Sequence, residues 1–158
     1  MLPETTALAA AGIDAGSALE AATARPRRDI RMTQAAEAAV LRPAEAGAWG
    51  HDLRAALAAR IARLNGEEAL AQGYATAAGA HVALADPAAR GEGVTAAVLG
   101  FMDKVAARTR EVAAGDIAAL QATGIADPDI VRLCELNAFL AYQIRVIQGL
   151  RLLKGLAA

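Results

Sequence analysis

The stretch LRAALAARIARLNGEEALAQGY, residues 53–74, predicts two consecutive helices joined by a tight turn. Its first half repeats apolar residues at intervals of three and four, which is the period of an amphipathic α-helix. The Asn-Gly pair in its middle tolerates the backbone conformations that commonly end a helix. A second helix then begins at Glu67 and is expected to run to about Ala80, so the sequence predicts a helical hairpin over residues 52–80.

Three arginines lie between the apolar positions of the first helix of this hairpin. Arg54, Arg60 and Arg63 fall largely on the side opposite its apolar residues. A helix with one apolar and one charged face normally turns the charged face to solvent. We therefore expect these arginines to point away from the core. Asp52, at the start of the helix, is expected to be its N-cap.

The composition favours one α-helical domain. The chain has the length of one domain, 158 residues, of which 56% are hydrophobic and only 3% are aromatic. Alanine, leucine, valine and isoleucine must therefore fill the core, which suits closely packed helices. The net charge of -1 leaves no basic excess to neutralise phosphates, so we expect no nucleic-acid partner.

Helix signals recur along the rest of the chain. Residues 44–50 are expected to form a joint whose tryptophan, Trp49, fills a seam of the core. The other expected helical segments are a broken, alanine-rich lead-in over 4–23 and helices over 27–41, 94–107, 116–121 and 127–150.

The last of these helices carries apolar residues on several faces. Beside its main apolar row it carries Val131, Phe139, Val146 and Leu153. One neighbouring layer of helices would not cover them all. This pattern predicts either a central helix or a helix that lies in a subunit interface.

The sequence shows no targeting or membrane segment and no cysteine pattern that would indicate disulfides or a metal site. The N-terminal residues lack the basic flank and the long apolar run of a secretory signal, and no segment offers about 18 uncharged apolar residues. The single cysteine, Cys134, excludes an internal disulfide framework and a cysteine-rich metal site within one chain. We therefore expect a soluble, cytoplasmic protein with no membrane partner, no metal and no cofactor.

Three stretches occur in an order and spacing that are typical of one known superfamily. They are LRAALAARIARLNG (53–66), FMDKVAARTREVAAGDIAALQATGIADPDIVRL (101–133) and AFLAYQIRVIQGL (138–150). In these stretches the chain resembles the alkylhydroperoxidase D and carboxymuconolactone decarboxylase superfamily. The resemblance implies an all-α fold, a helical bundle with a central hairpin and a long C-terminal helix. It places this domain at residues 46–158 and makes residues 1–45 an appended N-terminal helical layer.

The resemblance does not extend to the thiol chemistry of the redox-active members. In those proteins a Cys-x-x-Cys pair follows the Asn-Gly break, and a histidine lies four residues beyond the second cysteine. Laid onto this chain, the cysteines fall on Glu67 and Leu70, and the histidine falls on Tyr74. The proton-relay glutamate of the superfamily falls near Ala55. Because a thiol peroxidase needs a thiolate to attack the O–O bond, we expect no such activity here.

Glu67 and Glu68 can be interpreted in three ways. A carboxylate at a helix N-terminus is stabilised by the unpaired N–H groups and the partial positive charge there. A general base or a contact to a small ligand is the second interpretation. A metal site is the third, although the two histidines, His51 and His81, lie sixteen residues before and fourteen after Glu67, a spacing that does not support one.

The remaining candidates are a thiol, a histidine and two residues of the last helix. Cys134 is expected to pack in the core as a small apolar side chain, while a relocated reactive thiol is the alternative. Tyr142 and Arg145 are expected to be exposed or in an interface, and a pocket edge is the alternative for them. His51 is expected at the surface near a helix start.

Two functions are consistent with this pattern. In the first, the chain is a non-peroxidatic accessory or structural partner of a redox-active relative. In the second, it is a cofactor-free enzyme or a small-molecule-binding protein that uses Glu67, Tyr74 or His51 in the pocket where relatives hold their cysteines. The resemblance also implies a homo-oligomer, a trimer or a multiple of it.

Overall fold

The computed structural model describes residues 5–14, 17 and 27–156, and this part of the chain is helical with no strand. The all-α class expected from the composition is confirmed. Of the lead-in expected over 4–23, residues 5–14 and 17 are described and contain one short helix, and the rest lies outside the described residues. The helices are α1 (Thr6–Ala11), α3 (Arg27–Leu41), α4 (His51–Leu64), α5 (Glu68–Ala75), α6 (Gly93–Ala107), α7 (Ala114–Ala122) and α8 (Asp127–Leu156), with the 3-10 helices η1 (Gly79–Ala85) and η2 (Thr109–Glu111).

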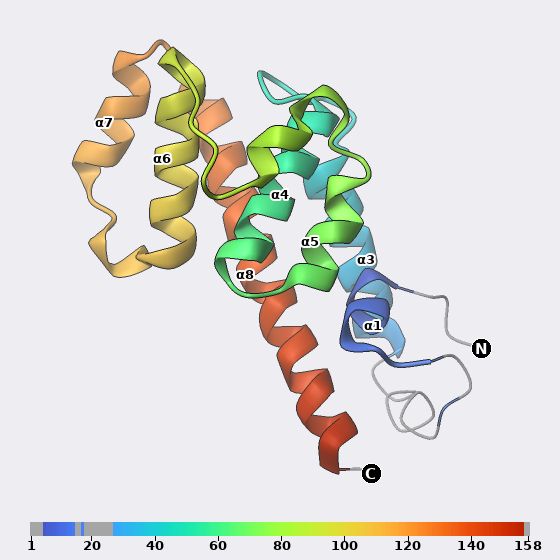
Figure 1. Ribbon diagram of the computed structural model, residues 1–158. Coiled ribbons are helices and arrows are strands. Elements are labelled where there is room, and N and C mark those ends of the chain that lie inside the picture. Colours follow the sequence, from blue (N-terminus) through green and yellow to red (C-terminus); the bar gives the residue numbers. More distant parts are fainter. Residues whose placement is uncertain (1–4, 15–16, 18–26, 157–158) are drawn as a thin grey trace.

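The α4–α5 hairpin lies at the centre of the molecule (Figure 1). On one side of it lie α1 and α3, and on the other side lies a second hairpin formed by α6 and α7. The long helix α8 contacts α1, α3, α4, α6 and α7, and its C-terminal end extends past the turn of the central hairpin. In the described residues, the two hairpins and the helices α1 and α3 are assembled along α8.

Helix α4 is buried on all sides. Every residue from 54 to 62 is buried, because α5, η1, α6 and α8 surround this helix and α3 touches it. The expectation that its arginines point away from the core is therefore wrong for two of them. Arg54 is 3% exposed and Arg60 is 1% exposed. Arg63 is partly exposed, with its Nε atom 3.4 Å from the Glu68 carboxylate.

Arg60 is buried because its N–H groups find acceptors inside the protein. Its Nε and Nη2 atoms donate to the two carboxylate oxygens of Asp103 on α6, at 2.6 and 2.7 Å. Its Nη atoms also donate to the backbone carbonyls of Leu84, Asp86 and Pro87, in and just after η1. A planar guanidinium can donate hydrogen bonds to a carboxylate and to several backbone carbonyls at once. These bonds offset the cost of burying its charge.

Arg54 is buried in the same manner at the other end of α4. It donates to the backbone carbonyls of Trp49, Val40 and Ala46, each at 2.9 Å. It therefore holds the connection between α3 and α4 against the helix that follows. The indole N–H of Trp49 donates to the carbonyl of Asp129 at 2.8 Å, and the ring is 6% exposed, so the expected role of this tryptophan in a core seam is confirmed.

The central hairpin turns where the sequence predicts, but its second helix is shorter than expected. Gly66 adopts a φ of 75°, which glycine tolerates without strain, and the chain turns into α5 at Glu67. Helix α5 ends at Ala75 rather than near Ala80, because the chain bends and Gly79 adopts a φ of 51° before η1 begins. A positive φ is incompatible with a continuous right-handed helix.

Most other helix boundaries agree with the sequence to within a few residues. Segments 27–41 and 94–107 correspond to α3 and α6, while α7 is somewhat longer than the expected 116–121. The last helix extends beyond the expected 127–150 to Leu156. Asp52 is not the N-cap of α4, because Gly50 occupies that position and the helix starts two residues earlier than that cap would place it.

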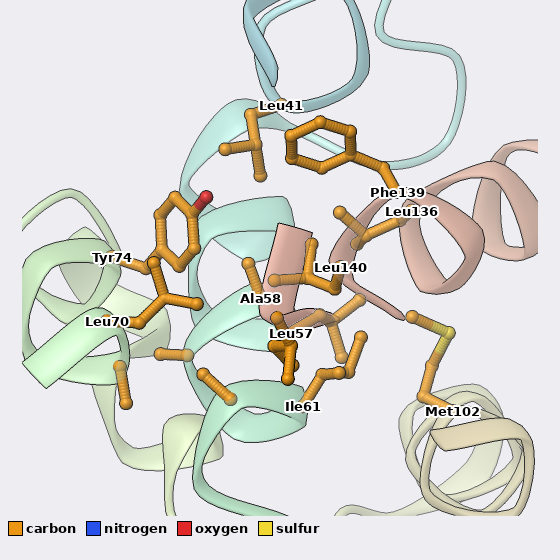
Figure 2. Close-up of a cluster of buried hydrophobic side chains, with 14 of the residues drawn as sticks. Leu41, Leu57, Ala58, Ile61, Leu70, Tyr74, Met102, Leu136, Phe139 and Leu140 are labelled. Atoms are coloured by element: carbon orange, nitrogen blue, oxygen red, sulfur yellow. The ribbon is translucent and has the colours of Figure 1, made fainter. Parts of the chain in front are cut away.

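The core forms where α4 meets α5 and α8. Leu57 and Ile61 of α4 lie against Leu70 of α5 and Leu136 and Leu140 of α8, as Figure 2 shows, and all five are at most 2% exposed. Helix α4 therefore has the central position, whereas α8 has one buried face and one open face. Among the helices of the described residues, none is both long and apolar enough to cross a membrane.

We predict that replacing Asp103 with alanine lowers the free energy of unfolding by about 2–4 kcal/mol, because it leaves the charge of Arg60 buried with carbonyl partners only. Urea unfolding of the purified protein measures this change. Glu111→Ala is the matched control, since it removes an ion pair with Arg108 in which both side chains are 59% exposed, and it should cost about 0.5 kcal/mol or less. Equal losses for the two variants would contradict the role given to Asp103.

Candidate functional site

Glu67 lies at the N-terminus of α5 but is buried, at 3% exposed. The guanidinium of Arg151 on α8 reaches it: Nη1 donates to Oε1 at 3.0 Å and lies 2.7 Å from Oε2. Oε2 accepts no hydrogen bond from the described residues, so the attraction of opposite charges holds it. Glu67 therefore joins α5 to α8 as half of an ion pair, a contact that its place in the sequence does not reveal.

The same arginine joins a third helix to this contact. Arg151 Nη2 donates to the carbonyl of Ala10 at the end of α1, at 2.9 Å. One turn further along α8, Lys154 donates to the carbonyl of Gly12. Gly12 ends α1 with a φ of 68°, which turns its carbonyl away from the helix toward this lysine. The acid at the start of α5 thus takes part in holding α1, α5 and α8 together.

Tyr74 belongs to a separate, buried chain of hydrogen bonds. Its hydroxyl donates to Oε1 of Gln143 at 2.6 Å, and Nε2 of Gln143 donates to Oε2 of Glu37 at 2.7 Å. The hydroxyl of Thr6 donates to the other oxygen of Glu37 at 2.8 Å. These bonds connect α5, α8, α3 and α1, and the tyrosine, glutamine and glutamate are at most 6% exposed.

The burial of Tyr74 fixes its protonation state. Loss of solvent and the nearby Glu37 carboxylate raise the pKa of Tyr74 well above its ordinary value. The hydroxyl therefore remains protonated throughout the neutral range and acts as a hydrogen-bond donor.

This chain of hydrogen bonds borders a cavity of about 520 Å³, which we call the Tyr74 cavity. Figure 2 shows the ring of Tyr74 within the packed core, with its oxygen directed toward α3. The cavity is lined by Thr6, Gln34, Glu37, Leu41, Arg42, His51, Ala55, Gly73, Tyr74, Thr76 and Ala77.

Of the three residues expected to share a pocket, Glu67, Tyr74 and His51, two line this cavity and one does not. His51 and Tyr74 both line it, whereas Glu67 does not. His51 is exposed, as expected, and its Nε2 atom lies 3.0 Å from the carbonyl of Pro43. Because a carbonyl only accepts, the neutral imidazole carries its proton on Nε2, and Nδ1 is the basic nitrogen.

Cys134 lies on α8, away from the Tyr74 cavity. Its side chain is partly buried and packs against the core, in agreement with its expected role as a small apolar residue. Burial, and to a lesser extent the charge of Glu135, raise the pKa of the thiol. At neutral pH the thiol is therefore protonated and a weak nucleophile.

The two other candidates on α8 differ from each other. Tyr142 is 48% exposed and its hydroxyl lies 2.8 Å from the hydroxyl of Thr33. Arg145 is exposed and lines a different cavity, which it shares with Cys134. Both residues are exposed, as expected. Arg145 also lies at the edge of a pocket, which was the alternative for it.

Sequence reasoning missed Glu37 and Gln143, although the sequence holds a signal for each. Gln143 lies three residues after Leu140 and four before Ile147, so it occupies a position of the buried face of α8. Glu37 lies four residues before Leu41 on the buried face of α3. A polar residue in the register of buried apolar residues indicates an internal hydrogen-bond network.

The histidines do not come together with other metal ligands. His81 lies 3.7 Å from a carboxylate oxygen of Asp52, and His51 contacts Pro43. Over residues 5–14, 17 and 27–156, no group of three or more His, Cys, Asp or Glu side chains is arranged to hold a metal ion.

Comparison of the chain with protein-family models, curated proteins and solved structures gives no match.

We predict that Glu67→Gln lowers the free energy of unfolding by about 1–3 kcal/mol, because it removes the charge that pairs with Arg151. The neighbouring Glu68→Gln is the matched control: this carboxylate is 69% exposed, so its loss should change stability by about 0.5 kcal/mol or less. Thermal unfolding at neutral pH measures both. A Glu67→Gln variant that melts higher than the wild type would show that the carboxylate is strained rather than stabilised.

Proposed function

We propose that the chain is a non-peroxidatic relative of the alkylhydroperoxidase D and carboxymuconolactone decarboxylase superfamily that binds a small organic molecule in the Tyr74 cavity. One observation carries this proposal. Ala55 and Tyr74, the positions that the resemblance pairs with the relay glutamate and the histidine of redox-active members, line the same cavity. In this chain the ionisable side chains that line the cavity with Tyr74 are those of Glu37, Arg42 and His51.

The chemistry of the cavity favours a ligand that both donates and accepts hydrogen bonds. Glu37 presents a carboxylate that accepts hydrogen bonds, and Thr6 and Gln143 orient it. Arg42 and His51 add a fixed positive charge and a titratable group to the lining. Small carboxylic acids and lactones carry oxygens that suit the arginine, and those with a hydroxyl also carry a donor for Glu37.

A role in proton transfer rests on His51. Its Nε2 proton is directed to Pro43, which leaves Nδ1 as the group that can accept a proton from a bound molecule. Tyr74 does not act as a base, since its hydroxyl stays protonated. Any acid-base chemistry in the cavity therefore uses His51 for transfer and the buried tyrosine for positioning.

We predict that a panel of small carboxylic acids and lactones contains compounds that raise the melting temperature of the wild type. Tyr74→Phe should weaken their binding about tenfold or more, because it breaks the hydrogen-bond chain that orients Glu37. The chain offers a matched control, since its other tyrosine, Tyr142, does not line the cavity. Titration calorimetry of the two variants measures the difference.

Two results would contradict this proposal. One is a panel in which no compound stabilises the protein. The other is equal affinity in the Tyr74→Phe and Tyr142→Phe variants, which would place any bound compound outside the Tyr74 cavity.

A second candidate function, an accessory partner in an oligomer, rests on the open face of α8. Val131, Tyr142 and Leu153 are 54%, 48% and 50% exposed, and they follow one another at intervals of eleven residues. An interval of eleven residues is close to three full turns, so these side chains form one stripe along the helix. Exposed apolar stripes of this kind are typical of protein interfaces. We propose that copies of the chain associate through this stripe.

For this assembly we predict an oligomer at micromolar concentration that a charge in the stripe dissociates. Tyr142→Glu should shift the mass measured by light scattering to that of a monomer, because an unpaired carboxylate in an apolar contact is costly. The control is Val82→Glu, at a residue of η1 that is 52% exposed and lies outside the stripe. A wild-type protein that is monomeric at this concentration would contradict the assembly and leave the ligand proposal untouched.

A further inference from the structure

The open face of α8 carries a row of residues that follow one another at alternating intervals of four and three. This spacing keeps side chains on one side of a helix and is typical of helices that pack along a second helix. All members of the row are exposed except Gly149, which is partly buried. The row consists of Val131, Glu135, Ala138, Tyr142, Arg145, Gly149 and Leu152, and we call it the heptad row.

The two charged residues of the heptad row are left without an ion pair in the described part of the chain. Glu135 forms no hydrogen bond or ion pair with another described residue. Arg145 donates to the carbonyl of Ala141 at 2.8 Å and pairs with no described carboxylate. The two are ten residues apart, about 15 Å along the helix, so they do not reach each other within one chain.

The uncharged residues of the heptad row alternate in size. Val131, Tyr142 and Leu152 are large, and they are 54%, 48% and 72% exposed. The small residues Ala138 and Gly149 lie between them. A Cβ added to Gly149 would meet no other described part of the protein within 4 Å, so this position is an open hollow. The row therefore carries both projections and hollows.

The heptad row is complementary to a second copy of itself that runs in the opposite direction. When two copies of α8 lie antiparallel and are centred on residue 140, Glu135 of each chain lies opposite Arg145 of the other. In the same register Tyr142 lies opposite Ala138, and Val131 lies opposite Gly149. A parallel pair would place each charge opposite its own copy, and like charges in contact are costly. Charge and size therefore select the same antiparallel register.

The antiparallel register also covers the C-terminal end of α8, which extends past the turn of the central hairpin (Figure 1). A groove of about 540 Å³ between α7 and α8 has a lining that includes Ile117, Ile130 and Val131. Its α8 residues lie between 127 and 138, which is the level of residues 142–153 of the other copy. Leu152 of the other copy therefore lies at the Asp127 end of this groove, where apolar side chains can bury it.

We propose that the open face of α8 is a two-fold dimer interface in which the heptad rows of two chains pack antiparallel and Glu135 of each chain pairs with Arg145 of the other. This inference rests on the assembly proposed above and adds the orientation and register of the partner. Because the axis is two-fold, every contact occurs twice. Any larger oligomer built from this pair contains an even number of chains.

Charge reversal tests the register. Glu135→Arg and Arg145→Glu each place like charges opposite one another at two points, so each should weaken dimerisation by about 100-fold or more and give a monomer at micromolar concentration. The double variant restores opposite charges and should be a dimer. An equimolar mixture of the two single variants should also be a dimer, because every arginine then lies opposite a glutamate. Light scattering measures each mass.

Two features of this experiment serve as controls. Glu68→Arg reverses the same charge at a side chain that is 69% exposed and lies outside the heptad row, and it should leave the mass unchanged. The double variant carries both substitutions, so its dimerisation shows that neither of them prevents folding.

A second substitution tests the fit of large residues onto small ones. Gly149→Leu fills the hollow opposite Val131 and should weaken dimerisation about tenfold or more. Gly100→Leu is the matched control, since this glycine of α6 is also helical and also has open space around it. Sedimentation equilibrium measures both dissociation constants. Equal constants for the two variants would overturn the register.

The results separate this inference from the assembly on which it rests. Single charge variants that remain dimers, or a double variant that is a monomer, would overturn the register, while dissociation by Tyr142→Glu would still support the assembly. A wild-type trimer would overturn the two-fold pairing. A monomeric wild type would contradict the inference and the assembly together.

Discussion

The burial of Arg60 is the constraint on which the arrangement of the helices depends. A guanidinium that is 1% exposed is tolerated only if acceptors surround it, and these come from Asp103 on α6 and from the carbonyls that follow η1. Both segments are therefore held against α4. The α6–α7 hairpin is placed by this contact on the far side of α4 from α1 and α3 (Figure 1). A cavity of about 530 Å³ remains between α4, α6 and α8.

The helices and the central turn were predictable from the sequence because they depend on local signals. The Asn-Gly turn and the apolar periodicity act over a few residues, and most observed boundaries lie within a few residues of those expected. The N-cap of α4 and the end of α5 are exceptions. The environment of α4 was not predictable from its own pattern. The spacing of its arginines predicted a solvent-facing side. Arg54 and Arg60 are buried instead, because they donate to carbonyls of the α3–α4 connection and of the loop after η1.

The candidate site was predictable only in part, for the same reason. Tyr74 was identified because it stands where redox-active members of the superfamily that the sequence resembles carry a histidine. Its partners Glu37 and Gln143 lie 37 and 69 residues away in the chain, on either side of it. Glu67 was identified correctly as a residue at a helix start, yet its ion pair with Arg151 spans 84 residues. Contacts over such separations arise from the packing of the helices and leave no local signal.

Helix α4 is the wall common to both cavities, since Ala55 lines one of them and Ile61 lines the other. Native-state hydrogen exchange tests the central position of α4 most directly. We expect the amides of residues 54–62 to exchange only through global unfolding, with the largest protection in the chain. Exchange of these amides through a local opening, at a free energy well below that of global unfolding, would contradict the central role of α4.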